Sequence, residues 1–165
     1  MRLAWLLLVL PALAACGNSS DAKTSPPTTT AAATVADERR LTQEQFTTAG
    51  NIVCLRSDRR VYRLGALSRD PSGWAKTARE ARVGIAEMKK LNPPLADQAG
   101  FDHMLVLAQR LADGIGQVHA ALMKKNYNAA RKAQFRAAAA DTAIHKQARR
   151  IGLTFCQQLL TNWPA

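Results

Sequence analysis

The chain has 165 residues, and its 23 Lys and Arg against 12 Asp and Glu give a formal net charge of +11. This length allows one folded domain with a tail and leaves no room for several domains. The positive charge favours anionic partners, such as lipid headgroups, acidic envelope polymers or acidic proteins.

The N-terminus has the order of a bacterial secretory signal, with a basic start, an apolar run and small residues. The stretch from Leu3 to Leu13 has 11 residues, fewer than the roughly 20 that a membrane-spanning helix needs. Its end, Leu13-Ala14-Ala15-Cys16, resembles a lipobox. The alternative is an ordinary signal peptide in which Cys16 has no role. The resemblance to lipoproteins implies that Cys16 receives a diacylglyceryl group and becomes the first residue of the mature chain.

The sequence divides into three parts: a lipoprotein signal peptide (1–15), a lipidated Cys with a tether (16–40) and a helical domain (41–165). The tether is rich in Ser, Thr, Ala and Pro, so it buries too little apolar surface to offset its ordering entropy. As a flexible coil it would span about 25–30 Å. We therefore expect a lipid-anchored domain at the outer face of the bacterial plasma membrane, where nucleic acid is not a partner.

Two cysteines remain after Cys16, namely Cys54 and Cys156. In an exported domain, two thiols are most simply explained by one disulfide. A zinc site is the weaker alternative, because neither cysteine has a second Cys or a His at ligand spacing. We therefore predict a Cys54–Cys156 bridge and no metal.

The domain has apolar residues at steps of three and four, which predicts helices throughout and no strands. Thr42 and Gln45 form a capping box that starts the first helix. Asp70 and Pro71 have the residue types that cap and begin the second. The predicted helices cover 42–64, 70–92, about 95–125 and 129–148, with Gly152 as a bend in the fourth helix or its end.

Four helices joined by short connections favour an all-α fold, an up-down-up-down four-helix bundle. In such a bundle the first and fourth helices are antiparallel neighbours. Cys54 in the first helix can then meet Cys156 late in the fourth, so the predicted disulfide joins helices 1 and 4.

The domain contains three spaced patterns, namely Phe46-x7-Cys54, Leu91-x-Pro93-Pro94 and Ala148-x3-Gly152-Leu153-x2-Cys156. Together they resemble a group of small actinobacterial helical lipoproteins with two cysteines in the exported domain. The resemblance covers about residues 42–157, and its patterns are structural ones. It implies an actinobacterial membrane as the location and implies no catalytic residues.

Arginines repeat along one side of the first predicted helix at i, i+3, i+4 and i+7, which places them on one face. This face is the predicted surface for binding an anionic lipid or envelope polymer. The alternative is an ordinary solvated face without a partner. The four residues are Arg56, Arg59, Arg60 and Arg63.

The sequence offers no constellation for catalysis. His103, His119 and His145 are isolated, and the Glu-x-x-His pairs of a di-iron bundle are missing. We therefore expect no cofactor, no catalytic residue and no enzymatic activity. The predicted function is a lipid-anchored, extracytoplasmic binding module for an anionic envelope component or an unknown protein partner. The alternative is a carrier of an apolar small ligand in the bundle core.

Overall fold

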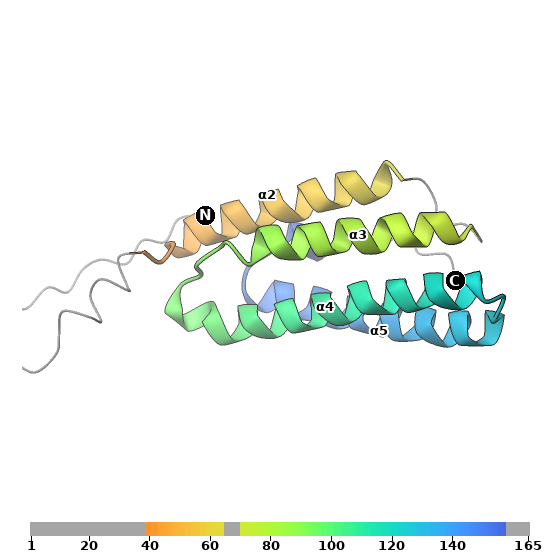
Figure 1. Cartoon of the computed structure of the whole chain (residues 1–165). Coiled ribbons are helices and arrows are strands. Elements are labelled where there is room, and N and C mark those ends of the chain that lie inside the picture. The colour runs from red at the N-terminus through yellow and green to blue at the C-terminus, as the bar shows by residue number, and fades with distance from the viewer. Residues whose placement is uncertain (1–38, 65–69, 158–165) are drawn as a thin grey trace, which may run out of the picture.

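The computed structural model describes residues 39–64 and 70–157. Within these ranges the chain forms four α-helices and one short 3-10 helix, with no strand, which confirms the all-α prediction. The helices alternate in direction as a four-helix bundle (Figure 1). In chain order the elements are α2 (Gln43–Tyr62), α3 (Pro71–Met88), α4 (Leu95–Met123), α5 (Tyr127–Arg150) and the 3-10 helix η1 (Phe155–Gln157).

The helix starts follow their local sequence. Thr42 and Gln45 form the predicted capping box, in which the Gln45 side chain accepts from the Thr42 amide at 2.9 Å and the Thr42 hydroxyl accepts from the Gln45 amide at 3.3 Å. Asp70 caps α3 by accepting from the Ser72 amide at 3.0 Å. Hydrogen bonds from Ser72 also hold the pKa of the Asp70 carboxyl below its ordinary value.

The helix ends of α4 and α5 share one geometry, in which a residue with positive φ reverses the chain. At the end of α5 this residue is Gly152, with φ 78°, and the Leu153 amide bonds to the Ala148 carbonyl at 2.9 Å. At the end of α4 it is Lys125, with φ 54°. Gly152 is therefore the stop of the fourth helix, and α5 does not continue to Cys156.

The bundle is closed on three of its sides by helix packing within the described residues. α2 packs on α3, α3 on α4, and α4 on α5 along most of their lengths (Figure 1). The Cα atoms of α2 and α5, as described, stay more than 8 Å apart. At the start of the bundle, the rings of Phe46 and Phe101 meet edge to face at 5.3 Å and join α2 to α4.

The fourth side is partly closed by a return segment, residues 151–156, which follows α5 and lies against α2. Its Leu153 is fully buried, and it approaches the backbone of Gly50 closely. Cys156 forms the predicted disulfide with Cys54 of α2, with 5.0 Å between the two Cα atoms. The bridge therefore reaches the fourth helix through η1, because Gly152 ends α5 before Cys156.

Residues just before α2 are held by the connection between α3 and α4. The Leu41 amide bonds to the Asn92 carbonyl, and the Asn92 side chain donates to the Arg39 carbonyl, both at 2.9 Å. The Arg40 guanidinium donates to the Pro93 carbonyl, also at 2.9 Å. We call this contact the N-terminal clamp. It fixes residues 39–41 against the connection between α3 and α4.

Candidate functional site

The structure divides the four predicted arginines of the first helix into two kinds. The side chains of Arg56 and Arg59 on α2, and of its C-cap residue Arg63, are exposed. Arg60 instead turns toward α3, and its side chain is 19% exposed. Three of the four therefore form an exposed cationic face, and the fourth does not.

Arg60 bridges α2 to α3 through two carboxylates. Its Nε lies 3.2 Å from Glu80 Oε2, and its two terminal nitrogens bond to the two oxygens of Glu87 at 3.0 and 3.2 Å. The glutamates are only about a quarter exposed, at 26% and 25%. The two terminal nitrogens of a guanidinium match the geometry of a carboxylate, so Arg60 fixes the packing of α2 on α3. The two glutamates also neutralise the charge of Arg60 locally.

Asp58 lies away from the exposed arginines. It is seven residues after Asn51, which places both on one stripe of α2, and Asn51 accepts from the Phe155 amide at 3.0 Å. Asp58 therefore faces the side of α2 on which the return segment lies. Burial raises the pKa of its carboxyl above the ordinary value.

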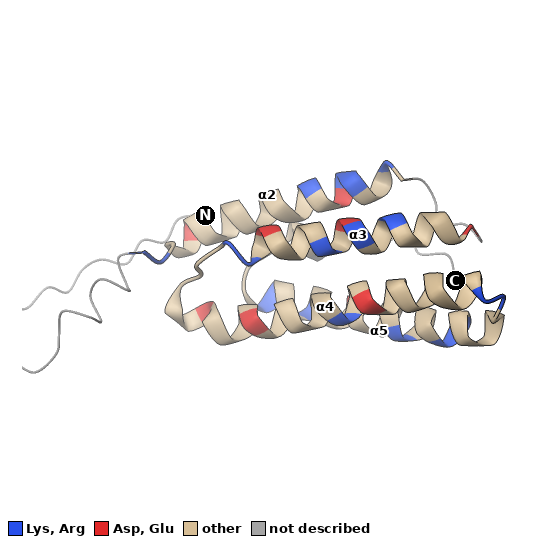
Figure 2. Cartoon of the chain, in the orientation of Figure 1, with Lys and Arg blue, Asp and Glu red and all other residues tan. Residues whose placement is uncertain are grey.

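A second group of cations lies at the end of the bundle where α3 and α5 finish and α2 begins (Figure 2). The described chain begins at this same end, at Arg39 in the N-terminal clamp. Lys89, Arg149 and Arg150 lie at the C-termini of α3 and α5, where cations offset the partial negative charge of the last carbonyls. We call this exposed group the tether-end cluster, and it consists of Arg39, Lys89, Lys90, Lys146, Arg149 and Arg150.

An apolar groove with a volume of about 100 Å³ runs into the bundle between the helices. All four helices and η1 contribute to its walls, and the two disulfide cysteines lie among its lining residues. The walls are largely aliphatic, and the hydroxyl of Thr77 is already bonded to the Gly73 carbonyl at 2.9 Å. The groove therefore offers contact area to an apolar group and few hydrogen bonds to a polar one.

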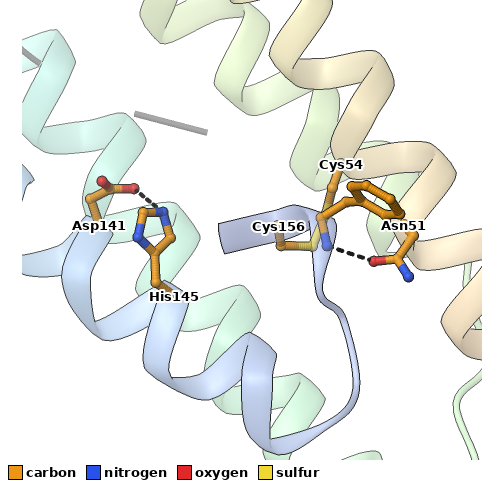
Figure 3. Close-up of a disulfide and its surroundings, with 6 residues drawn as sticks. Asn51, Cys54, Asp141, His145 and Cys156 are labelled. Carbon is orange, nitrogen blue, oxygen red and sulfur yellow. Dashed lines mark hydrogen bonds and ion pairs between the residues drawn. A yellow bond between two sulfur atoms is a disulfide. The ribbon is translucent and has the colours of Figure 1, made fainter. Parts of the chain in front are cut away.

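A pair of a histidine and a carboxylate side chain lies on the side of α5 that faces the disulfide (Figure 3). His145 Nε2 is 3.2 Å from Asp141 Oδ1, and the side chains are 18% and 12% exposed. The other two histidines lie elsewhere: His103 is exposed, and His119 Nδ1 is 2.9 Å from the Pro71 carbonyl. The structure therefore does not bring the histidines together.

Within residues 39–64 and 70–157, the structure has no group of three or more His, Cys, Asp or Glu side chains that could hold a metal ion. None of the helices in the described ranges is long and apolar enough to cross a membrane. Cys16, the predicted signal peptide and nearly all of the predicted tether lie outside the described residues.

Sequence reasoning did not predict the tether-end cluster as a site, and it gave an apolar ligand in the bundle core only as the alternative, without the residues that line the groove. The cluster joins cations from the ends of two helices and from the chain before α2, so its members are far apart in the sequence. The only local signal was the pairing of basic residues, as in Lys89-Lys90 and Arg149-Arg150. No family model, curated protein or solved structure matches the chain.

Proposed function

We propose that this protein is a lipid-anchored, extracytoplasmic and non-catalytic binding module that docks on anionic lipid headgroups. The lipobox-like sequence before Cys16 supports the anchor and the location at the outer face of the plasma membrane. The observation that carries the proposal is the position of the tether-end cluster. Its six exposed cations lie at the end of the bundle at which the described chain begins, at Arg39.

The anchor and the cluster act over different distances. A tether of this composition spans about 25–30 Å, whereas charges in physiological salt are screened beyond about 8 Å. The domain therefore spends part of its time outside the field of the headgroups. Each cation near an anionic surface contributes about 1 kcal/mol before screening, so several together favour a docked state that salt reverses.

Vesicle binding tests the docking proposal. The mature chain with Cys16→Ser lacks the acyl chains, so any binding to vesicles comes from the folded domain. We expect it to sediment with vesicles that contain phosphatidylglycerol, to bind less as salt rises, and not to sediment with neutral phosphatidylcholine vesicles. Equal binding to both kinds of vesicle would contradict the proposal.

Two neutralised variants locate the docking surface. Changing Lys89, Lys90, Arg149 and Arg150 to Gln should weaken binding to the anionic vesicles at least about tenfold. The matched control removes the same number of charges elsewhere, at Arg56, Arg59, Arg63 and Lys124, and should retain most of the binding. The reverse result would assign docking to the exposed arginines of α2.

The anchor itself is tested in a bacterial host that modifies lipoproteins. Radiolabelled palmitate should enter the chain, and Cys16→Ser should abolish this labelling. Labelling that survives the substitution would contradict lipidation at Cys16.

A second candidate function is a carrier of an apolar small ligand, which the apolar groove favours. Native mass spectrometry of the protein purified from membranes would then detect a bound apolar molecule. Its loss on extraction with organic solvent, with the mass of the chain unchanged, would show that the molecule is not covalently attached.

A further inference from the structure

Helix α5 turns one side to the bundle and the opposite side to solvent. Its buried apolar residues are three, four or seven positions apart, so they form one stripe that packs on the rest of the bundle. Phe135 is 69% exposed, and at about 100° per residue it lies nearly opposite the centre of this stripe. A large aromatic ring therefore projects from the solvent side of α5. The stripe consists of Ala130, Ala133, Ala137, Ile144 and Ala148.

Exposed cations lie along the same side of α5 as Phe135. Arg131 and Lys132 precede the ring by about one turn, and three further cations follow it about 16–23 Å along the helix. Arg136 does not belong to this group, because it donates to the Gln117 side chain of α4 at 2.9 Å. We call this surface the outer face of α5, and it consists of Arg131, Lys132, Phe135, Lys146, Arg149 and Arg150.

The outer face of α5 has no carboxylate of its own helix to neutralise these cations. The structure describes α5 over its whole length, and the single acidic residue in it is Asp141. Asp141 is buried, and its Oδ1 lies 3.2 Å from His145 Nε2 on the side that faces the disulfide (Figure 3). The outer face therefore combines five positive charges with one exposed ring, and its electrostatic complement is an extended anionic surface.

The exposed ring of Phe135 favours a lipid bilayer over a soluble polyanion as that surface. A polyanion offers partners to the cations, but it leaves the ring in water. At a bilayer, the cations meet the headgroups while an apolar side chain reaches the boundary with the acyl chains, about 5–10 Å deep. An anionic bilayer therefore satisfies both the charged and the apolar part of the outer face.

We propose that the domain docks on anionic lipid with α5 lying along the membrane, so that Phe135 inserts between the headgroups. This inference rests on the proposed lipid docking and adds the orientation of the docked domain. Lys146, Arg149 and Arg150 belong both to the tether-end cluster and to the outer face of α5. Docking then extends from the tether-end cluster along the 24 residues of α5, a length of about 36 Å.

A fluorophore at position 135 tests the insertion. In the mature chain with Cys16→Ser, Phe135→Cys supplies one thiol outside the disulfide for the environment-sensitive label nitrobenzoxadiazole. On phosphatidylglycerol vesicles we expect its emission to rise severalfold and shift to the blue, and nitroxide-labelled lipid to quench it. Val83→Cys is the control, because Val83 is exposed on α3, whose Cα atoms stay more than 8 Å from those of α5. Its label should keep the emission that it has in solution.

Sedimentation of the same chains with the vesicles separates two kinds of failure. Binding without a change of emission at position 135 would overturn the orientation and leave lipid docking intact. An equal change of emission at positions 135 and 83 would also overturn the orientation. If the unlabelled chain does not bind anionic vesicles at all, lipid docking itself is wrong and the orientation falls with it.

Two pairs of cations distinguish docking along α5 from docking through the end of the bundle alone. Arg131 and Lys132 lie near the start of α5, and Arg59 and Arg63 lie at the end of α2. Both pairs are therefore at the end of the bundle remote from the tether-end cluster (Figure 1). Changing Arg131 and Lys132 to Gln should weaken binding to anionic vesicles at least about fivefold and reduce its salt dependence. The same change at Arg59 and Arg63 should weaken it less than about twofold, and equal effects of the two pairs would overturn the proposal.

The contribution of the ring is tested without a label. Phe135→Ala should weaken binding to anionic vesicles at least about threefold and leave its salt dependence unchanged, whereas Phe135→Trp should retain the binding. Because the ring is exposed, both variants should unfold at the urea concentration of the parent chain, which separates loss of binding from loss of fold. Unchanged binding of the Phe135→Ala variant would overturn the proposal.

Discussion

Gly50 determines how closely the return segment approaches α2. A Cβ atom at this position would lie 2.5 Å from Leu153 Cδ2, and Leu153 is fully buried, so it has little room to move. We expect Gly50→Ala to lower the free energy of unfolding by about 1–3 kcal/mol, as measured by urea denaturation. Gly73 is the control, since a Cβ atom there would meet no side chain within 4 Å. Gly73→Ala should be neutral or stabilising by up to about 1 kcal/mol, and equal losses in both variants would contradict this account.

Lys125 holds a backbone conformation that favours glycine. Its φ is 54°, and the amides of Lys125 and Asn126 both bond back to α4 at 2.9 Å. A side chain with a Cβ costs about 1 kcal/mol or more in this region. We expect Lys125→Gly to raise the free energy of unfolding by about 1 kcal/mol, visible as a higher midpoint of thermal unfolding. Lys124→Gly, one residue earlier at φ −88°, should not be stabilising.

The contacts of a residue could be predicted from the sequence where its partners are close in sequence. They could not be predicted where the partners lie on another helix. Thr42 lies within one turn of Gln45, and Asp70 is next to Pro71. Residue type and spacing therefore suffice to predict these two helix starts. The pairing of Arg60 depends on how α2 is rotated against α3. The spacing of the arginines grouped Arg60 with its exposed neighbours. That spacing contains no information about the carboxylates on the second helix.

Among the contacts between helices, we expect loss of the Arg60 bridge to lower the free energy of unfolding most. Arg60→Ala leaves Glu80 and Glu87 without their cation at a partly buried interface. We expect a loss of about 1–3 kcal/mol in the free energy of unfolding. Arg59→Ala, on the exposed side of the same helix, should change it by less than about 0.5 kcal/mol. Chemical denaturation of both variants checks this, and a small effect of both would mean that the bridge is no more stabilising than a surface ion pair.

The helix bounds were largely predictable because stop signals lie in the sequence near the ends. Gly152 was expected as a bend or an end, and its positive φ makes it the end. The position of Cys156 in η1, beyond the end of α5, could not be predicted, because it depends on the path of the chain after Gly152. The missing contact between the described parts of α2 and α5 was also not foreseen, since a regular bundle closes on all sides. The groove follows from that missing contact.

For the whole molecule, the Cys54–Cys156 bridge is the main covalent constraint. It closes a loop with a sequence separation of 102, so in the chain-entropy model it contributes roughly 4–5 kcal/mol to stability. We expect the mature chain with Cys16→Ser, under native conditions, to show no free thiol toward a maleimide probe. Reduction, or the double variant Cys54→Ala and Cys156→Ala, should lower the unfolding midpoint strongly. Full labelling without reduction, or an unchanged midpoint, would contradict a stabilising bridge.

The N-terminal clamp also decides where mechanical load enters the molecule. A pull on the chain before residue 39 reaches the backbone at Arg39 and Leu41, which are hydrogen-bonded to the connection between α3 and α4. Part of the force therefore passes to α3 and α4 before the N-terminal end of α2 can detach from the bundle. Beyond that point Cys54 ties α2 covalently to the end of the described chain. If the chain is pulled from this end, we expect the helices to resist the force together.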